Sequence, residues 1–250
     1  AHARSALGAR RVLVIDWDIH HGNGIQHMFE SDPDVLYFSV HRYEKGDYFP
    51  GTKDAACTAV GVGAAAGLNV NVAWNTRGYG RPGDVEYLAV WRELLLPIAH
   101  EFAPDLIIVA AGFDAAEGDP LGGCHVTPHC YAELTRQLMA VGSGRLVLAL
   151  EGGYSLVATR ASAAGCMHAL VGIDLPRAKP APPAAREVKQ LPKRLAARLS
   201  RTANLGNRKP EIAPARGDMR TSAPLLDKGA RRCIDETKAV HRQFWRCLRE

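Results

Sequence analysis

Long hydrophobic runs are missing from this chain of 250 residues. No stretch of about 18 apolar residues occurs, and the first residues, AHARSALGARR, lack the basic and then apolar order of a secretory signal. We therefore expect no membrane span and no export. Six cysteines occur without a CxxC pair, which favours reduced thiols in the cytoplasm or nucleus. The composition, 47% hydrophobic and 23% charged, is typical of one globular domain.

Aromatic residues are absent from 176–232, which holds eight of the fifteen prolines. This segment carries 15 Lys+Arg against 4 Asp+Glu, whereas residues 1–175 carry 12 against 19. Such a composition buries too little apolar surface to offset the entropy of ordering, so we predict a basic, Pro/Ala-rich disordered insertion. Leucines at helical spacing in 191–205 allow an alternative, a basic amphipathic helix on an acidic partner. Sequence-specific nucleic-acid binding is not expected.

Apolar, β-rich runs alternate with helical stretches in residues 1–175. This alternation predicts an α/β fold, a mostly parallel sheet flanked by helices, with strands buried on both faces. Ligands of such sheets bind beyond the carboxyl ends of the strands. The expected strands are 11–15, 35–40, 68–73, 106–110 and 145–150, and the expected helices are 24–29, 84–102, 127–141 and 155–171.

Polar side chains follow the first, fourth and fifth expected strands. In extended backbone Asp16, Asp18 and His20 project to one side, about 7 Å apart in succession. Asp18 and His20, joined by Asp114 from a neighbouring strand end, would supply three ligands and leave a fourth position open, as in catalytic zinc sites. Iron and manganese accept the same ligand types, and a single strand-end carboxylate more often caps a helix.

Four motifs in order, DWDIHHGNG, SVHRYEKGDYFPGT, AGFDAAEGDPLGG and LEGGYSL, resemble the zinc-dependent histone deacetylases. The resemblance is closest to class IIb, especially the second catalytic domain of the tubulin-deacetylase type. It implies an arginase/deacetylase-like three-layer sandwich. The implied plan is 1–175 for the carboxy-terminal part of the catalytic domain, 176–232 for the insertion and 233–250 for the closing helix.

The resemblance also implies roles for single residues. Asp18, His20 and Asp114 match the Zn²⁺ ligands, and Tyr154 matches the tyrosine that donates a hydrogen bond to the substrate carbonyl. A structural K⁺ site is implied at Asp16, the backbone around His20, Ser39 and Val40, and a second, more loosely, near Phe29 and Val35. Asn23 matches the partner of a catalytic histidine. The substrate tunnel is implied at Phe49, Leu121 and Gly153.

The implied activity is zinc-dependent hydrolysis of the acetyl amide of N6-acetyl-lysine in histones, tubulin or other proteins. Tyr154 argues against the weakly active class IIa type, which carries His there. Leu121 argues against a polyamine substrate, because the polyamine-preferring relative carries Glu at that position.

Two features of the family have no counterpart in this chain: the tandem histidines that act as base and acid, and the opposite aromatic wall of the tunnel. His21 is not one of that pair, since it follows the ligand in extended chain and points to the other face. We therefore expect the amino-terminal part of the domain to be missing, one side of the sheet to be exposed, and turnover to be reduced or absent. Two alternatives remain open: an inactive form acting as a binding or scaffold module, and an arginase-like manganese hydrolase.

Overall fold

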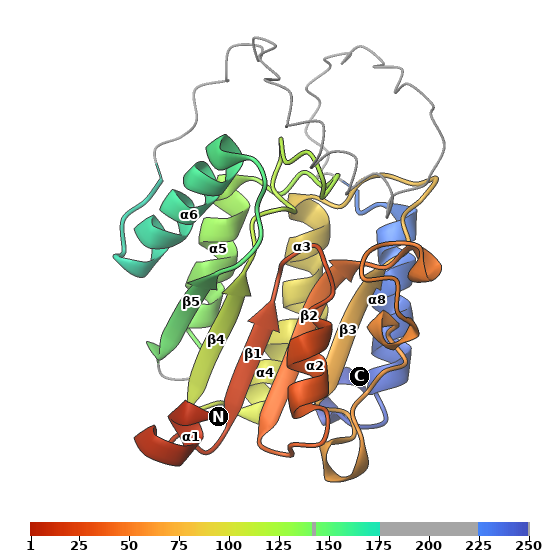
Figure 1. Cartoon of the computed structure of the whole chain (residues 1–250), viewed down its shortest axis with the longest axis vertical. Coiled ribbons are helices and arrows are strands. Elements are labelled where there is room, and N and C mark those ends of the chain that lie inside the picture. Colours follow the sequence, from red (N-terminus) through yellow and green to blue (C-terminus); the bar gives the residue numbers. More distant parts are fainter. Residues whose placement is uncertain (142–143, 176–224, 250) are drawn as a thin grey trace, which may run out of the picture. The chain divides into compact units, whose positions relative to one another are not determined.

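The computed structural model of the chain describes residues 1–141, 144–175 and 225–249. Its centre is one five-stranded parallel sheet in the order β3-β2-β1-β4-β5 (Figure 1). The predicted α/β fold is confirmed, and each predicted strand agrees with an observed one to within two residues. The strands are β1 (Val12–Asp16), β2 (Val35–Arg42), β3 (Asn69–Trp74), β4 (Leu106–Ala111) and β5 (Leu146–Leu150).

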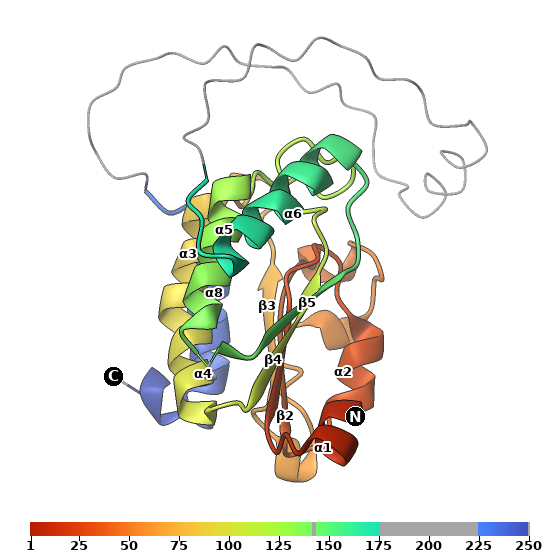
Figure 2. The same ribbon diagram turned by 90° about the vertical axis from the view of Figure 1, so that its left-hand side faces the viewer.

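Helices lie on both faces of the sheet, as Figure 2 shows. One face carries α1 (His2–Leu7) and α2 (Asn23–Phe29). The other carries α3 (Asp84–Val90), α4 (Leu96–Phe102), α5 (Pro128–Met139) and α8 (Lys228–His241), and α6 (Leu156–Leu170) packs against α5. The larger apolar core lies on this second face, and its largest buried side chains are Trp17, Trp74 and Trp91. Among the described residues no helix combines the length and apolar character that a bilayer crossing requires.

The helix predicted at 84–102 is continuous but contains a wider turn. A π-helical turn, η4 (Trp91–Leu95), connects α3 to α4, and the N–H of Leu96 donates to the carbonyl of Trp91. The physical reason is Pro97, which has no N–H for the carbonyl four residues earlier, so a helix that continues through it must adjust its hydrogen bonds.

The carboxy-terminal helix begins earlier than predicted. We expected it at 233–250, but α8 starts at Lys228 because the Asp227 carboxylate accepts hydrogen bonds from the N–H groups of Gly229 and Ala230, at 2.8 and 3.2 Å. Most of the predicted disordered insertion (176–232) and all of the alternative amphipathic helix (191–205) lie in 176–224, outside the described residues.

The prediction that every strand is buried on both faces was wrong for β5. β1, β2 and β3 are buried nearly throughout, whereas Val147 and Leu150 on β5 are 51% and 65% exposed. Within the described part of the chain β5 pairs only with β4 and forms one edge of the sheet. The exposed apolar surface continues onto the start of α6, where Leu156 and Val157 are 85% and 71% exposed. One side of the sheet is thus open near β5.

Candidate metal centre

Two carboxylates and one imidazole meet at the carboxyl ends of β1 and β4. Asp18 and His20 lie in the segment after β1, and Asp114 lies after β4. His20 Nδ1 is 3.1 Å from Asp18 Oδ1 and 2.9 Å from Asp114 Oδ2. The ligand atoms of the three side chains all lie within 4.8 Å of one another, and among the described residues this is the one such group of three.

Backbone hydrogen bonds fix the directions of the two carboxylates. Asp114 Oδ1 accepts the N–H of Ile19 at 2.7 Å, which leaves Oδ2 facing His20. Asp18 Oδ1 accepts the N–H of His20 at 2.8 Å, and its Oδ2 accepts the N–H of Gly152 at 3.1 Å. These bonds tie the ends of β1, β4 and β5 together around the cluster.

Glycines form the walls of the cluster. A Cβ atom at Gly112 or Gly152 would overlap the carboxylate of Asp18, and one at Gly122 would overlap the backbone of Asp114. Only a residue without a side chain allows the backbone to approach the acidic groups this closely.

The two carboxylates of the cluster favour a positive charge beside them. Burial lowers the pKa of His20, but the hydrogen bonds to Asp114 and Asp18 outweigh burial and raise it to about 9. Burial, assisted by the Asp18 charge, raises the pKa of Asp114, whereas the bonds from His20 overcome burial at Asp18 and lower its pKa. Buried carboxylates are costly unless a cation compensates them. The two carboxylates and the imidazole are ligands that zinc, iron and manganese accept, so the residues present fit a divalent metal ion.

A further carboxylate lies behind the cluster. Asp16 is 2% exposed, and it accepts hydrogen bonds from the Tyr37 hydroxyl at 2.8 Å and the N–H of Asp18 at 3.2 Å. Burial raises the pKa of Asp16 well above its usual value. Its position is that of a group supporting the Asp18 segment.

The other residues predicted around a cation lie on β2 and α2. Ser39 pairs with Asp16 across the sheet, and its Oγ is 2.8 Å from Nδ1 of His41, while Val40 is fully buried. Asn23 is the first residue of α2 and is partly exposed. Phe29 ends α2 and Val35 begins β2. A potassium ion at either site stays a prediction.

Two exposed aromatic side chains flank the cluster. The ring of Tyr154, 55% exposed, lies 6.3 Å from the ring of His20 and at 88° to it. The ring of Phe49, 64% exposed, lies 5.8 Å from His20 and at 76°. Gly153, beside Tyr154, has a φ of 127°, and a Cβ there would overlap the hydroxyl of Thr159.

Sequence reasoning missed two side chains near His20. The Tyr48 ring is stacked on His20, and the Arg42 guanidinium lies over the Tyr48 ring, 4.3 Å from its centroid. The Tyr48 hydroxyl donates to the carbonyl of Leu121 at 3.1 Å, which links the Phe49 loop to the predicted tunnel residue Leu121, itself partly buried. The signal available in the sequence was the adjacent aromatic pair Tyr48-Phe49.

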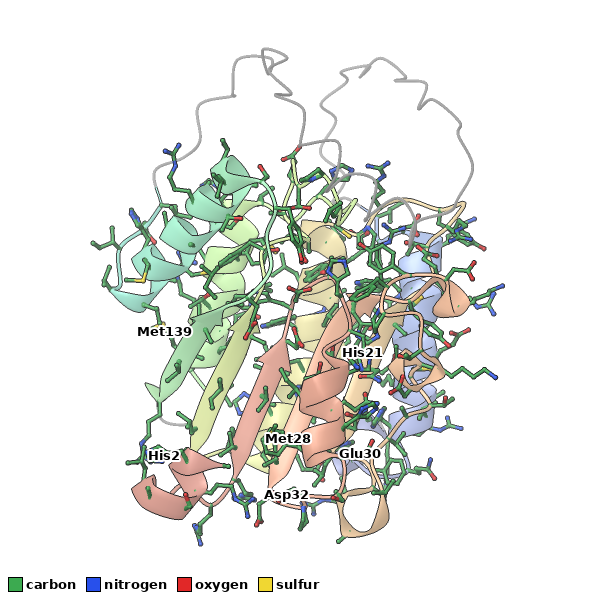
Figure 3. All side chains as sticks on the ribbon, in the orientation of Figure 1. His2, His21, Met28, Glu30, Asp32 and Met139 are labelled. Atoms are coloured by element: carbon green, nitrogen blue, oxygen red, sulfur yellow. The ribbon has the colours of Figure 1, made fainter. Side chains whose placement is uncertain are left out.

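His21 points away from the cluster, in agreement with the alternation of an extended chain. It is 3% exposed and lies beside α2 (Figure 3). Its Nε2 is 2.8 Å from Oε1 of Gln26, and its ring is 4.7 Å from the ring of His41. Burial lowers the pKa of both histidines, that of His41 to about 3. The two consecutive histidines thus lie in different environments.

Comparison with known proteins gives one consistent result. The family model described as "Histone deacetylase domain" matches residues 1–170. Histone deacetylase 5 and histone deacetylase 18 of Arabidopsis thaliana are 49% and 48% identical to the chain over 168 residues, which is 67% of this chain. The matched part is 25% and 24% of those proteins, so the chain spans about a quarter of their length.

Two solved structures have the same fold. The histone deacetylase Clr3 has a TM-score of 0.74 and 33% identity, over 99% of this chain and 34% of that one. The HDA15 HD domain has a TM-score of 0.72 and 33% identity, over 97% of this chain and 53% of that one.

Proposed function

The chain belongs to the histone deacetylase family, and from that membership we propose that it forms the metal-binding part of a site that hydrolyses the acetyl amide of N6-acetyl-lysine in proteins. The observation that carries this proposal is the convergence of Asp18, His20 and Asp114 next to the exposed ring of Tyr154. Family members are enzymes, and their shared reaction needs a metal site and a hydrogen-bond donor on opposite sides of one carbonyl group.

Zinc is the proposed metal, because the family is zinc-dependent in general and because three protein ligands with an open position are typical of catalytic zinc. When bound, zinc supplies a Lewis acid that polarises the amide carbonyl and lowers the pKa of water. Asp18, His20 and Asp114 would hold it. Their carboxylates are already oriented by the N–H groups of Ile19, His20 and Gly152, so little reorganisation is needed.

Tyr154 is the proposed donor to the oxyanion. Burial raises the pKa of its hydroxyl, and the charges of Asp114 and Asp18 raise it further. The hydroxyl therefore keeps its proton at neutral pH and can donate it in a hydrogen bond. A single donor of this kind stabilises the transition state by about 3 kcal/mol in comparable sites.

The substrate is proposed to enter beside Phe49 and Leu121. Phe49 presents an exposed ring next to His20, which suits the apolar stem of an acyl-lysine. Leu121 carries no charge, which favours acetyl-lysine in proteins over a polyamine. Class IIb, tubulin-type specificity, with tubulin or histones as substrates, is part of the proposal through the resemblance of the four sequence motifs. Tyr154 supports it only against class IIa, and Leu121 only against a polyamine substrate.

Two further parts of the proposal concern a structural potassium ion and the location of the protein in the cell. A structural K⁺ beside the zinc is suggested by the buried Asp16 and by its pairing with Ser39. A location in the cytoplasm or nucleus is suggested by the six cysteines, all of them unpaired. An acidic partner for the basic segment stays a prediction from composition.

The test is an assay of acetyl-lysine peptide hydrolysis with a parallel count of bound zinc. Because the chain covers 53% of the HDA15 HD domain, we would assay the full chain alone and joined to the rest of a related domain. We expect zinc in both forms and hydrolysis in the joined form. Tyr154→Phe should keep the zinc and lose about 100-fold in kcat or more.

Tyr79→Phe is the matched control, since Tyr79 is 54% exposed and lies in the segment between β3 and α3. It should behave as the parent does. A joined protein that binds zinc without hydrolysing the peptide, or a Tyr154→Phe variant as active as the parent, would contradict the proposal.

A further inference from the structure

One carboxylate connects the two loops that carry the predicted substrate-facing residues. Asp119 Oδ1 accepts the N–H groups of Leu121 at 2.8 Å and of Gly122 at 3.1 Å. Asp119 Oδ2 accepts the N–H groups of Tyr154 at 2.7 Å and of Ser155 at 3.2 Å. Each oxygen thus serves one loop, and the side chain joins the turn after β4 to the turn after β5.

Each of these loops leads directly to the metal-binding cluster. On the first, Gly122 packs against the backbone of Asp114, and the carbonyl of Leu121 accepts the hydroxyl of Tyr48, whose ring is stacked on His20. On the second, Gly152 donates to Asp18. Asp119 therefore closes a ring of contacts that runs around the cluster.

The Tyr154 loop needs such an anchor. Tyr154 follows Gly152 and Gly153, and glycine gives the unfolded and fluctuating backbone more freedom than other residues do. Beyond Tyr154, Ser155 caps α6 by accepting the N–H of Ala158 at 3.3 Å. The carboxylate of Asp119 fixes the backbone at the point between the flexible glycines and the start of the helix.

A carboxylate suits this position better than an amide. Four N–H donors converge on two oxygens, and hydrogen bonds to an ionised acceptor are stronger than neutral ones. An asparagine offers one oxygen, and its NH₂ group would face two N–H donors without accepting from either. Asp119→Asn is thus nearly identical in shape and releases one of the two loops.

We propose that Asp119 is a positioning residue, which holds Tyr154 beside the metal-binding cluster as the donor to the substrate carbonyl and holds Leu121 at the wall of the proposed substrate tunnel. The inference rests on the proposed function for its catalytic consequence, while the positioning itself is a property of the fold. Asp119 acts through Tyr154 and does not need to touch the substrate.

The kinetic test compares Asp119→Asn with Asp105→Asn. Asp105 makes the same kind of clamp at the opposite end of β4, where its Oδ2 accepts the N–H groups of Arg10 and Arg11 at 2.8 and 2.9 Å. In whichever form of the chain is active, Asp119→Asn should lower kcat about 10- to 100-fold, with KM within about twofold and zinc content unchanged. Asp105→Asn should leave both constants near those of the parent. Equal kinetics for the two variants would overturn the inference.

A second measurement uses the full chain and needs no activity. With fluorotyrosine incorporated, the ¹⁹F signal of Tyr154, assigned by its loss in Tyr154→Phe, should shift or broaden in Asp119→Asn and remain unchanged in Asp105→Asn. In the unaltered chain, the amides of Tyr154 and Ser155 should exchange with deuterium at least about 100-fold more slowly than in unstructured peptide.

The two proposals can fail separately. If no form hydrolyses acetyl-lysine, the proposed function fails, and the ¹⁹F and exchange results alone decide on Asp119. An unchanged Tyr154 signal in Asp119→Asn overturns the inference even where deacetylation is observed. If Asp119→Asn does not fold, unprotected Tyr154 and Ser155 amides in the unaltered chain overturn it and protected ones support it.

Discussion

The ring of Tyr48 lies nearly parallel to that of His20, with 5.3 Å between centroids and 12° between planes. The Arg42 guanidinium also lies over the Tyr48 ring, so the His20 imidazole packs against a ring that is itself held in place. Residues that orient metal ligands commonly change metal affinity by 10- to 100-fold when altered.

We therefore expect Tyr48→Leu to weaken zinc binding by about tenfold. Tyr48→Phe is the matched control, because it keeps the stack and loses only the hydrogen bond to the Leu121 carbonyl. It should bind zinc as the parent does, with a loss of about 1 kcal/mol in the free energy of unfolding. Competition with a chelating dye measures the affinities. Zinc bound equally tightly by Tyr48→Leu would show that the stack does not orient His20.

Zinc should stabilise the folded chain through the three-residue cluster. At a free concentration of 100 times Kd, the free energy of unfolding should rise by about 2.7 kcal/mol, and a chelator should reverse the gain. Asp114→Asn keeps the Oδ1 acceptor for Ile19 but replaces the oxygen that faces His20, so it should lose most of the gain. Thermal melts with and without zinc test this, with Glu117→Gln, an exposed carboxylate, as control. A full zinc response in Asp114→Asn would place the ion elsewhere.

His241 predicts an acid-sensitive stability. It is fully buried in α8, neither ring nitrogen has a hydrogen-bond partner among the described residues, and burial lowers its pKa to about 4. The unfolded chain, with a pKa near 6.5, binds the proton more readily. His241 thus adds no pH-dependent term above pH 6.5, and stability is lost as the pH falls from there toward 4.

The change that isolates this effect is His241→Leu. Between pH 7.5 and pH 5 its free energy of unfolding, relative to that of the parent, should rise by about 2 kcal/mol. Urea unfolding at the two pH values measures the difference. A pH-independent difference would mean that His241 is protonated equally in the folded and unfolded chains.

The open edge at β5 predicts association of the chain. An unpaired strand with exposed apolar side chains is a template for further pairing. Val147→Lys should reduce association in sedimentation and lower the binding of a hydrophobic dye, while the free energy of unfolding changes by less than about 0.5 kcal/mol because the side chain is half exposed. Met28→Lys, on α2 (Figure 3), changes a still more exposed apolar side chain away from β5 and should leave association unaltered. Association that persists in Val147→Lys would assign it to another surface.

The strands and most helices could be predicted because their signals are local. Buried apolar runs gave the positions of β1 to β4, and the helix predicted at 127–141 corresponds to α5, which Thr127 caps. The exposure of β5 could not be read from its composition, since RLVLAL is as apolar as a buried strand and only the neighbour on its other side determines burial. The early start of α8 depended on Asp227, which in the sequence lies within a basic stretch and was assigned to it.

The candidate site likewise contains residues that local sequence patterns predicted and residues that they did not. Alternation along the chain and the strand-end rule were enough to expect Asp18, His20 and Asp114 together, and the structure brings them together. Tyr48 and Asp119 each contact a partner that is distant in the sequence. Tyr48 stacks on His20, 28 residues earlier, and Asp119 accepts the N–H of Tyr154, 35 residues later. Such contacts arise only from the packing of loops, which no local pattern encodes.

The glycines at Gly112, Gly122 and Gly152 have a lasting consequence for how this scaffold can diversify. Since a side chain at any of these positions would overlap the carboxylate of Asp18 or the backbone of Asp114, substitution of any of the three would distort the cluster. Variation in what the site accepts is therefore expected at exposed neighbours of the cluster such as Phe49, rather than at the three glycines.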